Sequence, residues 1–319
     1  MLRHTFNQYR RLLPCYFVPF VSYSQLLRVI NNSNHDAIAI CDSDKTIYTY
    51  KELLQLSLQF STFLNQSEYR NVSTVACYAM PSAQYIVTMF GSWLSRRAFC
   101  PLSIAHSSKE LEYFIADSKS TIVIEGDFVK IPSSFPGILR FESVMQQSGE
   151  LCDEKFVSKL NALVDNIDSD ADALIVYTSG TTGRPKGVVL SHENIAFMTE
   201  GLRVSWKYDP SDRILHFLPL HHLHGLLNKL LVPLYAGAMV EFTPSASPDR
   251  LLRRLSYPEC FPMPHRPITL FMAVPTIYAK ILRLIKDVTS SGNKHISGDV
   301  HSAITPSELD SAVQSIRSV

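Results

Sequence analysis

The sequence predicts an α/β protein built on doubly wound, mostly parallel sheets. Short apolar runs of strand length alternate with longer segments in which apolar residues recur at helical spacing. This alternation is typical of strand–helix–strand units in a parallel sheet. A capping box opens one of the expected helices, because Thr49 stands three residues before Glu52.

The expected elements follow one another from residue 37 onward. Two short strands around a turn at Asp42-Ser43-Asp44 precede a helix over 49–64. A strand (73–80), a helix (82–97) and a strand (98–103) come next. They are followed by a helix over 107–118, which Ser107 or Ser108 caps, and by a strand over 120–126.

A weakly patterned stretch, 131–172, comes before the rest of the alternation, and we interpret its acidic end as a solvated linker. Strands over 171–177 and 187–190 flank a polar loop, and Ser191 caps a helix over 192–204. A strand (213–220), a helix (224–237) that Pro233 interrupts, a strand (238–243) and a helix (247–257) follow. A last strand (267–274) and helix (275–285) precede the point at which the pattern ends.

Composition limits the classes of function. With 30 basic and 29 acidic residues and a formal net charge of +1, the chain has no overall field that favours nucleic acid or an anionic membrane. No apolar run reaches the ~18–20 residues that span a bilayer. The six cysteines are scattered without a C-x-x-C pair, so we expect reduced, mostly buried thiols rather than disulfides or a zinc site.

Residues 1–35 have the composition of a targeting segment. They include four arginines together with aromatic and serine residues, and they contain no Asp or Glu. Such a leader is typical of mitochondrial transit peptides, so we expect a location in the mitochondrial matrix, with an ordinary disordered tail as the alternative. The α/β domain is expected over 36–286 and a divergent polar tail over 287–319.

The polar loop between the strands at 171–177 and 187–190 has the composition of a phosphate-binding loop. Its residues are Thr178, Ser179, Gly180, Thr181, Thr182, Gly183, Arg184, Pro185 and Lys186. Glycines let backbone N–H groups point inward as an anion nest, hydroxyls donate to phosphate oxygens, and the lysine adds a compact cation. Because Lys186 is followed by Gly187 and a strand rather than by a helix, the loop is not a Walker A motif. A flexible hairpin without a ligand is the alternative.

The stretch "YTSGTTGRPKGV" resembles the signature phosphate loop of the adenylate-forming superfamily, which includes acyl-CoA synthetases, luciferases and peptide-synthetase adenylation domains. "LPLHHLHGLLNKLLVPLYAGA" and "LFMAVPTIYAKI" resemble the next two blocks of that family, in the same order. With "YIVTMFGSW" and "ELEYFIADSKS", these blocks are most similar to the mitochondrial malonate–CoA ligase branch. The resemblance covers residues 37–284 and implies the fold of the N-terminal adenylation domain.

The resemblance also implies an activity, that of an ATP-dependent acid–thiol (acyl-CoA) ligase. Such an enzyme activates a small carboxylic acid, here malonate, to an acyl adenylate with release of pyrophosphate, and then passes the acyl group to CoA. Residues 178–186 would bind the phosphates of ATP, with Mg²⁺ bridging them. The implied partners are the acid, ATP and CoA, and a short- or medium-chain fatty acid is the rival substrate.

The family blocks also suggest residues of the acyl site. By resemblance, His222 lies at the edge of that site, where it would donate a hydrogen bond to the carboxylate or to developing charge. His224 either lines the same pocket or is a core histidine. Val274, Pro275 and Thr276 are expected at the wall of the acyl pocket, with core packing as the alternative for Val274.

A second carboxylate on the substrate would call for a cation. Lys229 and Arg203 are candidates by charge alone, and a solvated surface role is favoured for both. No metal site is expected at the H-H-x-H motif, because three imidazoles on one short loop do not converge easily on one ion.

The family's later blocks, which contact adenine and ribose and supply a C-terminal lysine, have no counterpart in the sequence. We therefore expect an α/β domain that is incomplete at its C-terminus, no family C-terminal domain, and weak or absent turnover. Three hypotheses stay open: a fragment of a malonate–CoA ligase, a truncated pseudo-enzyme that retains nucleotide binding, and a structural or interaction role.

Overall fold

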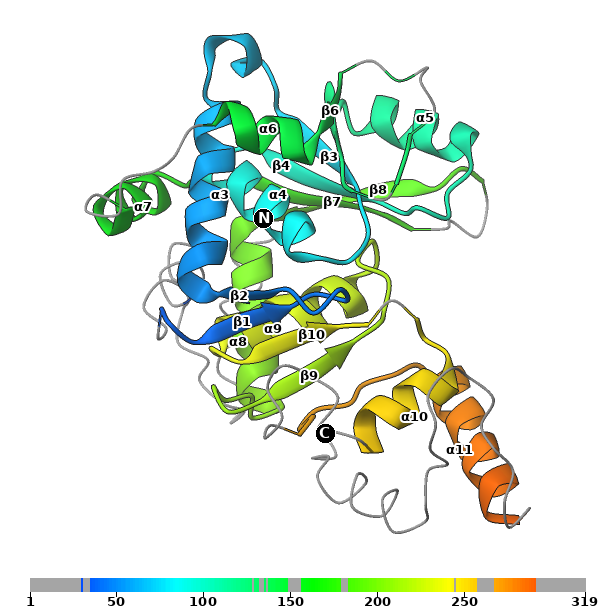
Figure 1. The fold of residues 1–319 in the computed structure, drawn as a ribbon. Coiled ribbons are helices and arrows are strands. Elements are labelled where there is room, and N and C mark those ends of the chain that lie inside the picture. Colours follow the sequence, from blue (N-terminus) through cyan, green and yellow to red (C-terminus); the bar gives the residue numbers. More distant parts are fainter. Residues whose placement is uncertain are drawn as a thin grey trace, which may run out of the picture.

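The computed structural model describes residue 30 and residues 35–127, 129–131, 135, 137–148, 156–178, 183–243, 245–256 and 267–290. Most of the expected leader (1–35) and most of the expected tail (287–319) lie outside the described residues. Two sheets, with helices around and between them, make up the structure (Figure 1). The predicted α/β class with mostly parallel sheets is confirmed.

A six-stranded sheet carries the polar loop. Its strands lie in the order β6 (Ile138–Arg140), β5 (Ile122–Glu125), β3 (Thr74–Tyr78), β4 (Ala98–Leu102), β7 (Asp172–Thr178) and β8 (Lys186–Ser191). All neighbours are parallel except β7 and β8, which form an antiparallel hairpin. The central strands β3 and β4 are buried over their whole length, as expected for a parallel sheet that is covered on both faces.

A four-stranded sheet pairs strands from the start of the described chain with strands from residues 213–242. Its strands lie in the order β2 (Ile47–Thr49), β1 (Ile38–Cys41), β10 (Met239–Phe242) and β9 (Arg213–His216). β1 and β10 are parallel, with Ile40 opposite Val240, and β10 is parallel to β9. β2 is an antiparallel edge strand, so the hairpin expected around residues 42–44 is confirmed.

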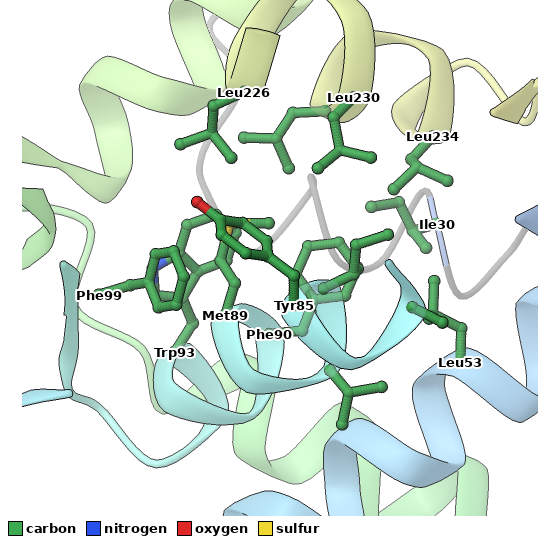
Figure 2. Close-up of a cluster of buried hydrophobic side chains, with 14 of the residues drawn as sticks. Ile30, Leu53, Tyr85, Met89, Phe90, Trp93, Phe99, Leu226, Leu230 and Leu234 are labelled. Atoms are coloured by element: carbon green, nitrogen blue, oxygen red, sulfur yellow. The ribbon is translucent and has the colours of Figure 1, made fainter. Parts of the chain in front are cut away.

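Helix α4 (Ala83–Leu94) forms the centre of the main core between the two sheets (Figures 1 and 2). All its residues except Gln84 are buried. It packs against α3 (Tyr50–Leu64), against β4, and against a helical segment made of the π-helix η3 (His224–Leu231) and α9 (Val232–Tyr235). The side chains that face it from these elements include Leu53, Phe99, Leu226, Leu230 and Leu234.

Polar contacts fix α4 to both sheets. The carboxylate of Asp42, which follows β1, accepts the first N–H of the helix at 2.9 Å. The Tyr85 hydroxyl donates to the Leu220 carbonyl at 3.1 Å, and the Trp93 indole N–H donates to Ala173 of β7 at 2.7 Å. Satisfying these buried groups determines how the helix lies relative to β1, β7 and the segment after β9.

The remaining helices lie outside this centre. They are η1 (Ser67–Tyr69), α5 (Ser108–Asp117), α6 (Phe141–Gln147), α7 (Phe156–Asp165), α8 (His192–Ser205), α10 (Pro248–Ser256) and α11 (Pro275–Ser290). Of these, α5 and the α10–α11 pair pack in two separate apolar clusters. The predicted helix starts are confirmed: Thr49 and Glu52 form both bonds of a capping box, and Ser191 caps α8. Ser107, rather than Ser108, caps α5. Cys41, Cys77 and Cys100 are buried free thiols, and the other cysteines lie outside the described residues.

The stretch 131–172 is more regular than its sequence pattern indicates. It contributes the edge strand β6 and the helices α6 and α7, which bury Phe141, Val144, Phe156 and Leu160. The strand has three residues and the helices have 7 and 10, so each element has too few apolar positions to give a clear period. The acidic end, expected to be a solvated linker, comprises the end of α7 and the turn before β7.

The strand expected over 267–274 does not form. In the described part of this segment, Leu270 makes one isolated bridge to Ile214. The Thr269 hydroxyl accepts the N–H of Arg213 at 2.9 Å and donates to the Asp212 carboxylate at 2.9 Å. The main-chain N–H groups of Thr269 and Leu270 also donate to the Arg213 carbonyl, at 3.0 and 3.1 Å. The segment is therefore held against β9 at one point, without a ladder of strand length.

Pro233 also interrupts less than expected. Helical structure continues through it, because α9 follows the π-helix η3 without a break. The Asn228 carbonyl, five positions before Pro233, accepts a hydrogen bond from the Tyr208 hydroxyl at 2.9 Å. The turn before Pro233 has π-helical geometry.

A buried ion cluster holds α10 against the four-stranded sheet. Glu241 of β10 is fully buried and accepts from Arg213 of β9 at 2.9 Å and from Arg254 of α10 at 2.7 Å. Both guanidinium groups are also buried, and the Glu241 carboxylate compensates their charge locally.

We expect Glu241→Gln to lower the free energy of unfolding by about 3 kcal/mol, because it leaves two buried guanidinium groups without their anion. Asp249→Asn is the matched control, since Asp249 forms an ion pair with Arg253 on the same helix but remains partly exposed. The control should cost less than about 1 kcal/mol. Urea unfolding measures both values, and equal losses in the two variants would contradict the assignment.

Candidate functional site

A crevice lies where the carboxyl ends of strands from both sheets meet. Its cavity has a volume of about 280 Å³. It is lined by Ser43 after β1, 79–81 after β3, 103–105 after β4, 217–221 after β9 and Thr243 after β10. Ligands of open α/β sheets bind outside the carboxyl ends of the strands, so this cavity has the expected position of a substrate site.

The predicted phosphate loop lies at the same end of the six-stranded sheet. Thr178 ends β7, which neighbours β4, and Lys186 begins β8 directly opposite Thr178. The structure describes the loop residues 178 and 183–186, whereas Ser179, Gly180, Thr181 and Thr182 lie outside the described residues. The described ends of the loop, Thr178 and Lys186, are both exposed, so their polar groups are accessible to a ligand.

Helix α5 supports the strand that leads into the loop. The Tyr177 hydroxyl donates to the Asp117 carboxylate at 2.9 Å and lies 3.2 Å from the Phe114 carbonyl. The rings of Tyr177 and Phe114 are 4.3 Å apart between centroids. Asp117 is not among the residues predicted for the site. Its position at the end of a predicted helix that packs on a parallel sheet could have indicated it.

The histidine-rich turn after β9 contributes to the cavity through His221. The His221 ring lies 4.1 Å from that of His222 and 5.3 Å from that of His106. Burial, together with the neighbouring His222 and His106, lowers the pKa of His221 to about 4. A neutral imidazole with one donor and one acceptor is therefore the form of His221 at neutral pH.

The other two histidines of the motif are exposed. His222 lies beside His221 rather than on the wall of the cavity, and its role in the acyl site stays a prediction. His224 begins η3 and is exposed, so the core interpretation does not hold for it. The core histidine of this region is His216, which is fully buried with its Nε2 2.9 Å from the Gly225 carbonyl.

Lys229 is a clear correction, because the surface position favoured by the sequence is wrong for it. Its side chain is fully buried on η3. The Nζ donates to the Met272 carbonyl at 2.8 Å and lies 3.8 Å from the centroid of the Phe217 ring. Burial holds the pKa of Lys229 well below its usual value. Hydropathy could not place this lysine inside, since the aromatic face and carbonyl that accommodate it come from distant segments.

Arg203 fits its predicted surface position more closely. It is partly exposed and forms two hydrogen bonds to Glu200 on its own helix, at 2.7 and 2.8 Å. Neither Arg203 nor Lys229 lines the cavity.

The segment predicted at the wall of the acyl pocket lies at the start of α11. Val274, Pro275 and Thr276 are exposed and do not contribute to the cavity. Core packing, the alternative, does not hold for Val274, which is 38% exposed, whereas Met272 is buried. The role of these three residues in acyl binding stays a prediction.

Over the described ranges, no group of three or more His, Cys, Asp or Glu side chains is arranged to hold a metal ion. Within the same ranges, no helix combines the length and the apolar character needed to cross a bilayer.

The chain is similar in sequence to AMP-binding enzymes and to CoA ligases. Residues 27–315 match the family described as AMP-binding enzyme. A probable CoA ligase of Humulus lupulus is 33% identical over 277 residues, covering 82% of this chain and 45% of that protein. The mitochondrial malonate–CoA ligase of Mus musculus is 35% identical over 259 residues, covering 77% of this chain and 42% of that protein.

A solved structure shares the fold. The crystal structure of ATP-bound MatB from Rhodopseudomonas palustris superposes with a TM-score of 0.63 at 26% identity, covering 82% of this chain and 51% of that one. The chain thus spans about half the length, or less, of these relatives.

The buried Lys229 gives a testable dependence of stability on pH. Because its pKa is lowered in the folded state, the folded state binds fewer protons than the unfolded state between that lowered value and about 10.5. The contribution of Lys229 to the free energy of unfolding therefore increases as pH rises through this interval. We expect the difference between wild type and Lys229→Met, measured by urea unfolding from about pH 7 to about pH 10, to rise with pH in favour of the wild type.

The exposed Lys280 of α11 provides the control substitution, Lys280→Met. A difference between wild type and Lys229→Met that stays constant across the pH series would contradict the buried position of an uncompensated amine.

Proposed function

The chain belongs to the family of AMP-binding enzymes, and on that basis we propose that it is the phosphate-binding part of an ATP-dependent acyl-CoA ligase. Its proposed substrates are ATP, a small carboxylic acid and CoA. The observation that carries the proposal is the position of the loop over 178–186, at the carboxyl end of β7 and beside the strand ends that line the cavity.

The proposed reaction has two steps. In the first, a carboxylate oxygen of the acid attacks the α-phosphorus of ATP, the bond to the β-phosphate breaks, and acyl adenylate and pyrophosphate form. In the second, the thiolate of CoA attacks the acyl carbonyl and AMP leaves. The loop would hold the β- and γ-phosphates and so stabilise the leaving pyrophosphate, with Lys186 as the cation and Thr178 among the hydroxyl donors.

Magnesium is proposed to arrive as part of the nucleotide substrate. It prefers oxygen ligands in octahedral geometry and keeps several waters, so phosphate oxygens and water would supply its coordination. The chain's own groups would then orient the phosphates around it, and such positioning lowers the barrier to an in-line displacement.

The acid is proposed to occupy the cavity beside the histidine-rich turn. His221 is neutral there, and an imidazole N–H can donate a hydrogen bond to a carboxylate without an ion pair. His222 is proposed to act at the mouth of the same site, where the acid would meet the nucleotide.

Malonate is the acid proposed, because a malonate–CoA ligase is among the relatives of more than 30% identity. A short- or medium-chain fatty acid remains the rival, since a relative described only as a probable CoA ligase has similar identity. The mitochondrial location proposed from the acid-free leader has support from the mitochondrial relative.

Nucleotide binding tests the loop directly. We expect Lys186→Ala and Thr182→Ala each to weaken binding of Mg–ATP, the lysine variant by about tenfold or more, because a charge-assisted contact to phosphate is lost. Calorimetric titration measures the dissociation constants. Lys280→Ala on α11 is the control and should bind as the wild type does; equal binding by all variants would refute the phosphate-loop assignment.

Substrate choice is tested by pyrophosphate release and by ligand-induced thermal shifts with malonate, methylmalonate, acetate and octanoate. With Mg–ATP present, malonate should give the fastest release and the largest shift. Preference for octanoate or acetate would reject malonate in favour of the rival class. Mg–ATP binding without pyrophosphate from any acid would instead support the nucleotide-binding alternative without turnover.

A further inference from the structure

Both ends of the phosphate loop are attached to the same helix, α5. The incoming end is held through Tyr177, whose hydroxyl reaches Asp117 and the Phe114 carbonyl at 2.9 and 3.2 Å. The outgoing end is held through Pro185, whose carbonyl accepts a hydrogen bond from the Tyr113 hydroxyl at 2.8 Å. These contacts join segments 60 and 72 positions apart in sequence.

The aromatic side chains extend these attachments. The Tyr113 and Tyr177 rings meet edge-on with centroids 6.2 Å apart. The Arg184 guanidinium lies 5.6 Å from the centroid of the Tyr113 ring, within the range of a cation–π contact. Arg184 is thus directed toward α5, whereas Lys186 is exposed.

Gly187 gives the Tyr177 ring the space that this arrangement needs. The two residues are opposite one another in the β7–β8 hairpin. A Cβ at position 187 would lie 3.2 and 3.3 Å from two ring carbons of Tyr177 and 3.4 Å from the Asp117 carboxylate. The missing side chain at Gly187 therefore avoids a tight contact with the tyrosine ring, and no left-handed backbone is involved.

The Tyr177 hydroxyl can keep its hydrogen bond to Asp117 over a wide range of pH. Burial raises the pKa of Tyr177, and the hydrogen bond to Asp117 raises it further. The hydroxyl therefore stays protonated and remains a donor to Asp117 throughout the range in which proteins are usually folded.

A loop that holds phosphates with backbone N–H groups needs its two ends at a defined spacing. Fixing one residue of a free chain costs about 1–2 kcal/mol, so a loop whose ends are already held loses less entropy when phosphate binds. From these contacts we propose that α5 forms part of the nucleotide site, with Tyr113 and Asp117 as positioning residues that set the spacing of the loop ends and Gly187 as the residue that admits the Tyr177 ring. This inference rests on the nucleotide-binding function proposed above.

The test removes single groups that touch the loop ends. Tyr113→Phe keeps the ring beside Arg184 and removes only the hydroxyl that bonds to Pro185. We expect binding of Mg–ATP and of inorganic pyrophosphate to weaken by about fivefold, while the shift produced by malonate stays unchanged. Tyr278→Phe is the matched control, because the Tyr278 hydroxyl also donates to a main-chain carbonyl, at 3.1 Å, but on α11.

Asp117 allows a rescue experiment that a general loss of stability would not reproduce. Asp117→Ala removes the acceptor of the Tyr177 hydroxyl and should weaken pyrophosphate binding by about fivefold. Asp117→Asn keeps a carbonyl acceptor and should restore most of that loss. Gly187→Ala should also weaken binding, because the added methyl group displaces the Tyr177 ring.

Limited proteolysis measures the loop without a ligand. Trypsin cleaves after Lys186 only when the loop opens, whereas Arg184 precedes proline and is a poor site. We expect cleavage at Lys186 to be about fivefold faster in Tyr113→Phe and in Asp117→Ala than in wild type and in Tyr278→Phe, at an unchanged midpoint of urea unfolding.

The outcomes separate this inference from the proposed function. If wild type binds Mg–ATP and Lys186→Ala does not, but Tyr113→Phe and Asp117→Ala bind and are cleaved as wild type, the role of α5 is refuted. If wild type binds no nucleotide, the proposed function fails, and the role of α5 in the nucleotide site fails with it; faster cleavage at Lys186 in the variants would then leave α5 as a structural anchor only.

Discussion

Burial of one helix on all sides is the constraint on which the described structure depends. α4 is buried except at Gln84, and it lies between the two sheets (Figure 1). Gly91 lets α3 approach closely, because a Cβ there would lie 2.6 Å from a ring carbon of Phe60. The hydroxyl of Tyr85 and the indole of Trp93 then tie the helix to the segment after β9 and to β7. A helix with no solvent-facing side cannot move independently of the sheets that it contacts.

The site follows from this arrangement. Because α4 fixes both sheets, the carboxyl ends of their parallel strands open into one crevice. The loop proposed to bind phosphate begins at the end of β7, at the same end of the six-stranded sheet. The buried cluster around Glu241 holds α10 against the four-stranded sheet. The buried Lys229 holds the segment that precedes α11 through the Met272 carbonyl. Tyr113 and Asp117 of helix α5 contact the two ends of the loop, at Pro185 and at Tyr177. Rigid elements therefore surround a loop whose composition favours flexibility, which is the usual division between scaffold and site.

Local signals predicted the fold well where they were strong. The capping residues Thr49 and Ser191 begin helices, the apolar runs of β3 and β4 are buried strands, and the loop between β7 and β8 is a hairpin connection. Prediction failed where an element was short or where distant groups decided the outcome. The stretch 131–172 contains helices of only two to three turns, and the segment around Thr269 makes one isolated bridge to β9 instead of forming a strand.

The sequence by itself determined the α/β class, the order of most elements and the phosphate-loop candidate, because periodicity, caps and loop composition are properties of neighbouring residues. The sequence also indicated the family, because the motifs and their order along the chain can be recognised without a structure. Only the tertiary structure decided that Lys229 is buried, that His221 lines the cavity and that Tyr113 and Asp117 hold the loop ends. Each of these depends on contacts between residues far apart in the chain, and such contacts exist only once the sheets and α4 have packed together.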